Sequence, residues 1–249
     1  MVTGVVLVIL ALAVSLFCRR DVTNPASVKA LRVLFVGNSL TSSNDLPAIV
    51  EALAAATGQR TFAYESIALP DFSLEDHWTK KDAQKAIMTA KWDSVVLQQG
   101  PSASKGGRAL LLEYSRRFAE EIRRAGGRPA LYMVWPAASR MDDFKGVSES
   151  YRQAAEAVDG LVFPVGEALL NAWKSDTSIA LYSGDGFHPS TAASYLAGLV
   201  IFEQLYDRSP VGLPSRLRLA SGAKIEIAAD LAVVLQRAAQ DANREFKRP

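Results

Sequence analysis

The sequence has very few residues that could hold a metal ion through sulfur or nitrogen. It contains one cysteine, Cys18, and two histidines, His77 and His188. A single cysteine excludes an intrachain disulfide and a cysteine-based zinc site, and two histidines argue against a histidine-based metal site. We therefore expect no metal and no cofactor, and any acid–base chemistry by imidazole has to use one of these two histidines.

The sequence also lacks the features of proteins that bind nucleic acids or nucleotides. The 28 Lys and Arg residues nearly balance the 26 Asp and Glu residues and form no basic block, so we expect no nucleic-acid partner. Neither the Gly-x-Gly-x-x-Gly fingerprint of dinucleotide binding nor a P-loop is present, which argues against a nucleotide site. The apolar fraction of 49% is at the upper end for a soluble protein, and part of this excess lies at the N-terminus.

Residues 2–17 carry no charged side chain and are followed directly by Cys18, Arg19 and Arg20. The stretch is slightly shorter than the roughly 20 residues of a membrane-spanning helix, and it suits the apolar core of an export signal. A buried N-terminal helix is the alternative, but an amphipathic helix would show regularly spaced polar positions. We expect residues 1–20 to be a signal peptide or an N-terminal membrane anchor. The protein would then be exported, periplasmic or extracellular, with membrane association through residues 2–17.

From residue 31 onward, short apolar segments alternate with segments of helical periodicity. Five apolar segments are rich in β-branched or aromatic residues, as expected of strands buried on both faces: 32–37, 61–68, 93–99, 129–135 and 161–166. Helical spacing of apolar residues appears in 107–125, after His188-Pro189, and again from Ile227. This alternation predicts one domain, 31–249, built as a three-layer α/β/α sandwich around a flavodoxin-like parallel sheet of about five strands.

Functional residues of such sheets lie just after the strands, at their carboxyl ends. After the first expected strand comes Gly37-Asn38-Ser39-Leu40, and in the last third of the chain comes Asp185-Gly186-Phe187-His188. Ser39 alone could simply cap a helix, and it is not in a Gly-x-Ser-x-Gly elbow because position 41 is Thr. The spacing of Asp185 and His188 lets the carboxylate orient one ring nitrogen while the other nitrogen faces outward.

Together these two blocks resemble those of the SGNH, or GDSL-type, hydrolases, which carry Gly-Asp-Ser-Leu after the first strand and Asp-x-x-His near the C-terminus. The resemblance covers most of residues 31–206. It implies that Ser39 is the nucleophile, His188 the base and Asp185 its orienting partner, in a serine esterase that works through an acyl-enzyme. Asn38 replaces the usual Asp, and its carboxamide can keep the hydrogen bonds of such a turn without the charge.

The donors that would stabilise the oxyanion are less similar to those of the family. Members usually offer the backbone N–H of the serine, a Gly N–H after the second strand and an Asn side chain after the third. After the second strand this chain has no Gly, and a backbone N–H near Asp71 or Phe72 could serve instead. After the third strand Ser102 stands where Asn is expected, and Gln99 could supply an amide donor on a longer arm.

Three further residues could contact a substrate. His77 is expected on a helix with its ring at the rim or in solvent, and contact with substrate is the alternative. Trp135 and Arg140 follow the fourth expected strand and could line an acyl or sugar pocket. An Arg in a polar loop is, however, usually only solvated.

The resemblance therefore predicts a serine ester hydrolase that removes short acyl groups, with acetyl on a carbohydrate as the family-based choice. Its substrate would be a small-molecule or carbohydrate ester. Two alternatives stay open. The same triad could pass the acyl group to a polysaccharide hydroxyl in an exported O-acyltransferase. The missing Gly and Asn are also compatible with an inactive carbohydrate-binding module.

Overall fold

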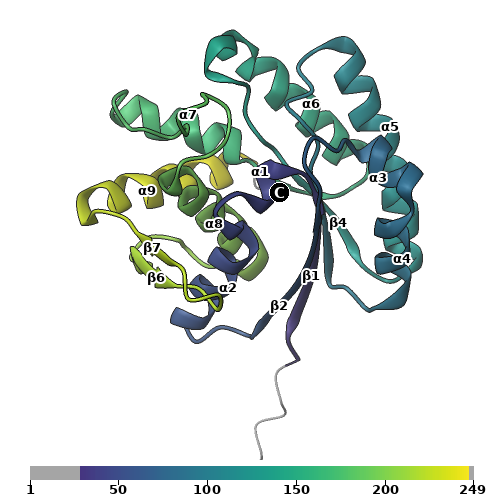
Figure 1. Ribbon diagram of the computed structural model, residues 1–249, viewed down its shortest axis with the longest axis horizontal. Helices are drawn as coiled ribbons and strands as arrows, with labels where there is room; N and C mark the ends of the chain where they lie inside the picture. The colour runs from purple at the N-terminus through teal and green to yellow at the C-terminus, as the bar shows by residue number, and fades with distance from the viewer. Residues whose placement is uncertain (1–28, 247–249) are drawn as a thin grey trace, which may run out of the picture.

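A five-stranded parallel sheet forms the centre of the computed structural model, which describes residues 29–246 (Figure 1). The expected signal peptide or anchor at residues 1–20 lies outside the described residues. In chain order the strands are β1 Leu31–Gly37, β2 Phe62–Ala68, β3 Ser94–Leu97, β4 Arg128–Tyr132 and β5 Leu161–Phe163. In space their order is β2-β1-β3-β4-β5, and every neighbouring pair is parallel.

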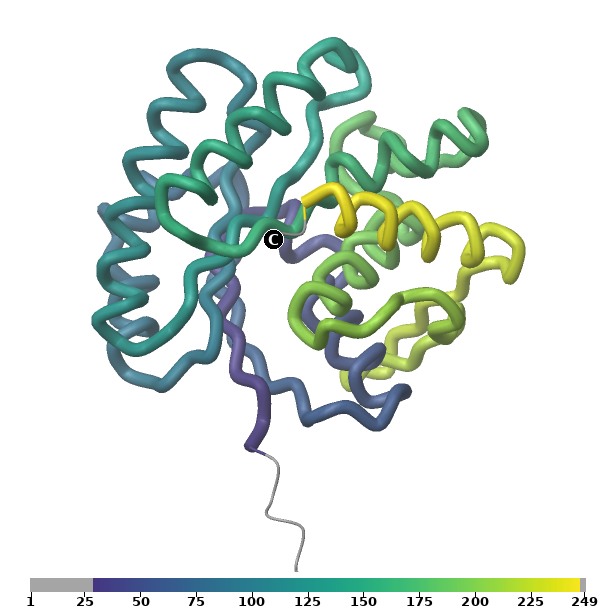
Figure 2. The backbone as a smooth tube through the Cα atoms, turned by 180° about the vertical axis from the view of Figure 1, so that it is seen from behind, coloured from purple at the N-terminus to yellow at the C-terminus, as the bar shows by residue number. Residues whose placement is uncertain are grey.

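Helices cover both faces of the sheet, as the two opposite views show (Figures 1 and 2). One face carries α2 Leu46–Ala56, α7 Val165–Ser175, α8 Thr191–Tyr206 and α9 Ala229–Phe246. The other face carries α3 Leu74–Lys80, α4 Asp82–Thr89, α5 Lys105–Arg124 and α6 Phe144–Ala157. The predicted three-layer α/β/α fold is therefore confirmed.

The predicted strands and helices form where their apolar residues are buried between the layers. The prediction of burial on both faces is wrong for β2, an edge strand that exposes Glu65 and Ser66. All four residues of β3 are buried, and β1 is buried at every position except Arg32, as expected for central parallel strands. The periodic segment 107–125 is α5, and the segment after Pro189 is α8. Met133, Val134 and Trp135 differ from the prediction, because they are buried but lie beyond the end of β4.

Several short elements are not indicated by the sequence pattern. β6 Arg216–Arg218 and β7 Lys224–Glu226 form an antiparallel hairpin that contacts α2. Each strand has only three residues and a single buried side chain, too few for alternation to be recognised. Three short helical segments lie in the loops: α1 Ser39–Ser42, η1 Ser43–Asp45 and η2 Ala138–Asp143. Among the described residues, no helix is both long enough and apolar enough to cross a membrane.

Candidate active site

Ser39 and His188 meet at the edge formed by the carboxyl ends of the parallel strands. Ser39 is the first residue of α1, two positions after the end of β1. His188 lies in the loop before α8, and Pro189 within that loop pairs with Tyr182 in an isolated bridge. In Figure 1, α1 lies at the upper end of β1. The parallel arrangement thus brings together residues that are 149 positions apart in the chain.

The three residues of the expected triad form a continuous hydrogen-bonded chain. Ser39 Oγ lies 2.9 Å from His188 Nε2, and His188 Nδ1 lies 2.5 Å from Asp185 Oδ2. A carboxylate on Nδ1 fixes the proton on that nitrogen, which leaves Nε2 as the acceptor for the Ser39 hydroxyl. This is the geometry that a serine nucleophile and its general base require.

Asp185 is fixed by its own loop. Its Oδ1 accepts hydrogen bonds from the Ser183 hydroxyl at 2.8 Å and from the backbone N–H groups of Phe187 and His188 at 2.9 Å each. The hydrogen bond from the His188 ring, followed by these three, holds the pKa of the Asp185 carboxyl well below its usual range. The carboxylate is therefore ionised whenever His188 can act as a base.

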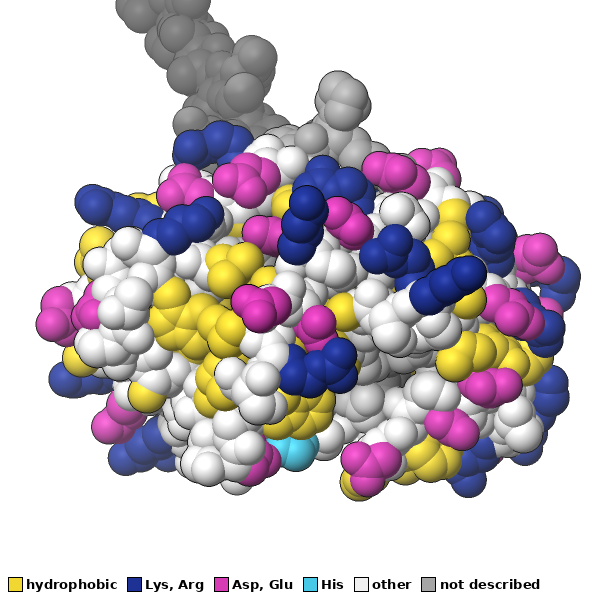
Figure 3. Space-filling model, turned by 90° about the horizontal axis from the view of Figure 1, so that it is seen from above, with side chains coloured by type: hydrophobic (Ala, Val, Ile, Leu, Met, Phe, Trp, Pro, Cys, Tyr) yellow, Lys and Arg dark blue, Asp and Glu magenta, His cyan; other side chains and the backbone are white. Residues whose placement is uncertain are grey.

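The triad is open to solvent on one side. The side chain of His188 is 37% exposed and that of Asp185 is 50% exposed. Figure 3 looks onto this edge of the molecule and shows a histidine side chain at the surface, next to acidic and hydrophobic side chains. A substrate can therefore reach the site without a change in the fold.

Asn38 shapes the turn between β1 and α1. Its Oδ1 accepts from the Leu40 N–H at 3.1 Å and caps α1, while its Nδ2 donates to the Phe72 carbonyl at 3.0 Å. The carboxamide thus makes hydrogen bonds within the turn, as the sequence suggests. Ser39 occupies the first helical position, whose N–H has no acceptor inside the helix, so this N–H is a natural donor to a substrate oxygen.

Gln98, which lies in neither sequence block, holds the same turn from the end of β3. Its side chain is fully buried, and its Oε1 accepts from the Asn38 N–H and from the Thr41 hydroxyl, both at 2.8 Å. Its Nε2 donates to the Gln99 carbonyl at 2.9 Å. The available signal was the Gln98-Gln99 pair directly after an apolar strand, where a buried amide needs partners.

Gln99 and Ser102 bind each other in the loop after β3. Gln99 Nε2 donates to Ser102 Oγ at 3.0 Å and to the Gly107 carbonyl at 3.3 Å, and its Oε1 accepts from the Leu74 N–H at 3.3 Å. Both amide hydrogens of Gln99 are therefore engaged within the protein. Likewise the N–H of Phe72 donates to the Leu69 carbonyl at 3.2 Å. These three candidates surround the site, with their donors engaged in fixing its loops.

His77 differs from the expectation of a ring at the rim or in solvent. It lies on α3, but its side chain is only 1% exposed, so that expectation is wrong. Its Nε2 lies 2.8 Å from the Gly37 carbonyl and must carry the proton, because a carbonyl only accepts. Nδ1 has no hydrogen-bond partner among the described residues. Burial is the main cause that lowers the pKa of the His77 ring, so the ring stays neutral. Its hydrogen bond holds Gly37, the residue before the turn formed by Asn38 and Ser39.

Trp135 and Arg140, both considered as pocket residues, have different positions. Trp135 is fully buried, donates its indole N–H to the Phe187 carbonyl at 3.0 Å and is not among the residues that line the pocket. Arg140 does line the pocket, and its guanidinium pairs with Asp143 at 2.5 Å. The Trp135 indole thus holds the loop that carries His188 through Phe187. The Arg140 guanidinium lies at the pocket that a substrate would enter.

A pocket of about 390 Å³ adjoins the triad through Asn38 and Phe187. Its walls come from the loops after β2, β3 and β4. The lining residues are Asn38, Asp71–Ser73, Gln99–Ser104, Gly107, Arg140, Asp143 and Phe187. The lining is a mixture of hydroxyl, amide, charged and aromatic side chains.

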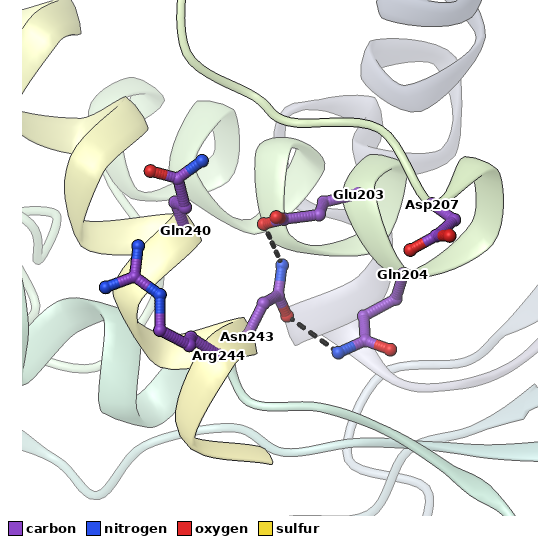
Figure 4. Close-up of a pocket in the computed structure, with 6 residues that line it drawn as sticks. All are labelled: Glu203, Gln204, Asp207, Gln240, Asn243 and Arg244. Carbon is purple, nitrogen blue, oxygen red and sulfur yellow. Dashed lines mark hydrogen bonds between the residues drawn. The ribbon is translucent and has the colours of Figure 1, made fainter. Parts of the chain in front are cut away.

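A second pocket, of about 230 Å³, lies between α8 and α9 and shares no residue with the first (Figure 4). Asn243 crosses it, donating to Glu203 at 2.6 Å and accepting from Gln204 at 3.1 Å. These two hydrogen bonds join α8 to α9 (Figure 4). Among the described residues, no group of three or more His, Cys, Asp or Glu side chains is placed to hold a metal ion.

The chain is similar to several proteins of known structure. No family model and no curated protein matches the sequence. Among solved structures, a candidate SGNH hydrolase from Slackia heliotrinireducens is 27% identical, with a TM-score of 0.61 over 71% of this chain and 100% of that chain. A DUF4886 family protein from Bacteroides uniformis is 20% identical, with a TM-score of 0.73 over 89% of this chain and 98% of that chain.

An acetyl-xylooligosaccharide esterase from Geobacillus is 14% identical, with a TM-score of 0.58 over 71% of this chain and 94% of that chain. At this identity the likeness shows the fold alone. Taken together, the structural neighbours include SGNH/GDSL-type hydrolases. The resemblance inferred from the two sequence blocks is thereby confirmed.

Proposed function

Because the chain has the fold of the SGNH/GDSL-type hydrolases and their serine, histidine and aspartate at one edge, we propose that it removes short acyl groups, acetyl above all, from ester substrates. The observation that carries this proposal is the Ser39–His188–Asp185 chain, with 2.9 Å between nucleophile and base. An inactive binding module has no need of a base held at this distance from a serine hydroxyl.

The reaction follows from the positions of the three side chains. His188 Nε2 takes the proton of Ser39 as Oγ attacks the ester carbonyl, and the imidazolium is stabilised by the Asp185 carboxylate. The protonated ring then gives its proton to the departing alcohol, and an acyl-enzyme remains on Ser39. Water, deprotonated by the same nitrogen, attacks the acyl group, and the proton returns to Ser39 as the acid leaves.

We assign the oxyanion donors to the Ser39 N–H and to Asn38. Asn38 lines the pocket, and of its two Nδ2 hydrogens only one is needed for the bond to the Phe72 carbonyl. In this assignment Phe72 orients Asn38, while Gln99 and Ser102 support the wall of the pocket. One such donor contributes about 10²–10³ in rate.

The pocket supports a short acyl group and a hydroxyl-bearing alcohol. A long acyl chain requires an extended apolar channel, whereas this pocket is of about 390 Å³ and is lined by serines, amides and the Arg140–Asp143 pair. Phe72 and Phe187 add aromatic surface on two sides, which suits the apolar face of a sugar ring. The Geobacillus neighbour, described as an acetyl-xylooligosaccharide esterase, has a similar fold.

The proposal is tested with aryl esters of increasing chain length and with acetylated xylo-oligosaccharides. We expect the acetyl ester to be hydrolysed fastest, the octanoyl ester slowest, and Ser39→Ala to lose the activity while keeping its circular dichroism spectrum. Full activity in Ser39→Ala would exclude the scheme. Products analysed with and without an added sugar acceptor distinguish hydrolysis from O-acyl transfer, since both share the acyl-enzyme.

We also propose that the protein is exported, with residues 1–20 acting as a signal peptide or as an N-terminal anchor that associates with a membrane through residues 2–17. The support is the uncharged composition of that segment. Cell fractionation tests this: recovery of the full-length protein from the cytoplasm would contradict it.

A further inference from the structure

The turn that carries Ser39 (the nucleophile turn, residues 38–45) contacts the loop that carries His188 (the histidine loop, residues 183–190) at two places. One is the Ser39–His188 hydrogen bond, and the other is made by Asn44. Asn44 lies in η1, five residues after the nucleophile. Its Nδ2 donates to the Pro189 carbonyl at 3.2 Å and to the Ser194 hydroxyl at 2.9 Å. Pro189 directly follows the base, and both Pro189 and Ser194 are buried, so the two acceptors are fixed in position.

The backbone around Asn44 is shaped to make this contact. Asn44 has φ 54° and ψ 20°, and Asp45 has φ 54° and ψ 54°. Two consecutive residues in the left-handed region are uncommon outside glycine, and such conformations persist only where surrounding contacts hold them. The Ser43 hydroxyl, in the same turn, donates to the Ser39 carbonyl at 2.6 Å. The turn is thus connected to the nucleophile at one end and to the histidine loop at the other.

Two other hydrogen bonds of the histidine loop do not involve the nucleophile turn. The Ser183 N–H donates to the His188 carbonyl at 2.8 Å, which closes the loop on itself. The Trp135 indole N–H donates to the Phe187 carbonyl at 3.0 Å, which ties the loop to the segment after β4. Neither contact sets the loop's distance from Ser39. The two hydrogen bonds of Asn44, by contrast, run directly from the turn that carries Ser39 to Pro189, the residue next to His188, and to Ser194 at the start of α8.

We propose that Asn44 is a positioning residue for the proposed hydrolysis: its amide joins the nucleophile turn to Pro189 and Ser194 and thereby holds Ser39 Oγ within reach of His188 Nε2. This inference rests on the proposed function. General-base catalysis requires hydrogen-bond distance between the two groups, and a displacement of about 1 Å at the reacting groups can lower the rate about 10²-fold.

The test compares Asn44→Gly with Asp45→Gly. Each change places glycine at one of two adjacent left-handed positions, but only the first removes the amide, since the Asp45 side chain does not cap α2. With an aryl acetate, we expect Asn44→Gly to lower kcat about 10- to 100-fold, with KM changed by less than about twofold. Asp45→Gly keeps the wild-type kcat. The rate of fluorophosphonate labelling of Ser39 falls in parallel with kcat.

A second set of variants separates positioning from folding. Ser194→Ala removes one acceptor from α8, and Asn44→Gly/Ser194→Ala should be no slower than Asn44→Gly alone, because both changes break the same link. Asn44→Asp keeps the size of the side chain, removes its donors and should lower kcat as Asn44→Gly does. Equal kcat in Asn44→Gly and Asp45→Gly would overturn the inference, as would a kcat loss that follows the midpoint of thermal unfolding across all variants. An inactive wild type would instead contradict the proposed function.

Discussion

Among the residues of the site, Asp185 is surrounded by hydrogen-bond donors that keep its carboxyl ionised. Its Oδ2 binds the His188 ring and its Oδ1 accepts three hydrogen bonds from its own loop. These bonds hold the pKa of the Asp185 carboxyl far below its usual range, so it remains an anion. Its charge can then stabilise the imidazolium that forms during the reaction.

Asp185→Asn tests this role. The carboxamide keeps the size of the side chain but removes the charge, and when it donates to Nδ1 it imposes the wrong tautomer on His188. We expect kcat for an aryl acetate to fall about 10³–10⁴-fold, with little change in thermal stability because the side chain is half exposed. Steady-state kinetics at pH 7.5 measure the effect. A loss of less than tenfold would mean that His188 needs no orienting partner.

His77 makes stability depend on pH. Burial lowers the pKa of its ring from the usual 6.5, so the unfolded chain binds a proton more readily than the folded protein does. The free energy of unfolding should therefore fall as the pH drops from about 7 to 5, by at most about 1.4 kcal/mol per pH unit for this single group. The carboxyls of Asp76 and Asp185, whose pKa values are lowered from 3.8, act only below this window.

Urea denaturation of the wild type and of His77→Gln at pH 7.5, 6 and 5 measures this dependence. Gln can donate to the Gly37 carbonyl but cannot be protonated, so its free energy of unfolding should vary less over the same range. If the wild type and His77→Gln have the same pH dependence, the neutral buried ring is not responsible for it.

Residues of the site differ in how far they could be predicted. The positions of Ser39, Asp185 and His188 follow from short blocks whose members are adjacent in sequence. Gln98, His77 and Asn44 could not be found in this way. Their partners are 57 to 60, 40, and 145 to 150 residues distant in the chain, respectively. A buried amide or imidazole has no periodic signature, because its place is set by tertiary hydrogen bonds.

At the scale of elements, the junction of β1 and α1 is packed without spare room. A Cβ on Gly37 would lie 2.4 Å from Gln98 Oε1 and 2.6 Å from Thr41 Oγ1. Gln98 is fully buried, so its amide cannot move aside without losing the hydrogen bonds to Asn38 and Thr41. The glycine is therefore required by the close approach of β3 to the nucleophile turn.

Gly37→Ala should destabilise the protein by about 1–3 kcal/mol, the usual cost of overpacking a core, and should also lower the esterase rate by shifting the turn. Gly106→Ala is the matched control. A Cβ at this position meets nothing within 4 Å, and position 106 lies in α5, where alanine is more favourable than glycine. The midpoint of urea denaturation and the aryl acetate rate are measured for both. Wild-type values for Gly37→Ala would show that the junction has room for a methyl group.

Prediction of the elements succeeds where one pattern governs a whole segment. β1 and β3 are apolar because both faces of the central sheet are covered, whereas the edge strand β2 exposes Glu65 and Ser66, and α5 shows a regular stripe of buried residues. It fails where an element is too short for periodicity, as in the β6–β7 hairpin and in α1, η1 and η2. These short segments are fixed by caps and side-chain hydrogen bonds, such as the Asn38 cap of α1.

At the scale of the whole molecule, the sheet order decides which loops meet. With β1 between β2 and β3, the loops after these three strands converge at one edge, where they form the turn that carries Ser39 and part of the pocket wall. The α8 helix, packed against α2, brings the histidine loop to the same edge. The alternation of strands and helices predicts the layers and the two blocks predict the triad, while the contacts of Gln98, His77 and Asn44 with the site appear only in the folded chain.

The most direct measurement of the central claim is covalent labelling with a fluorophosphonate, followed by peptide mass spectrometry. The account predicts a single adduct on Ser39, absent in Ser39→Ala and formed at least about 10²-fold more slowly in His188→Ala, since the hydroxyl is a weak nucleophile without its base. A wild-type protein that forms no adduct, or forms one on another residue, would contradict it.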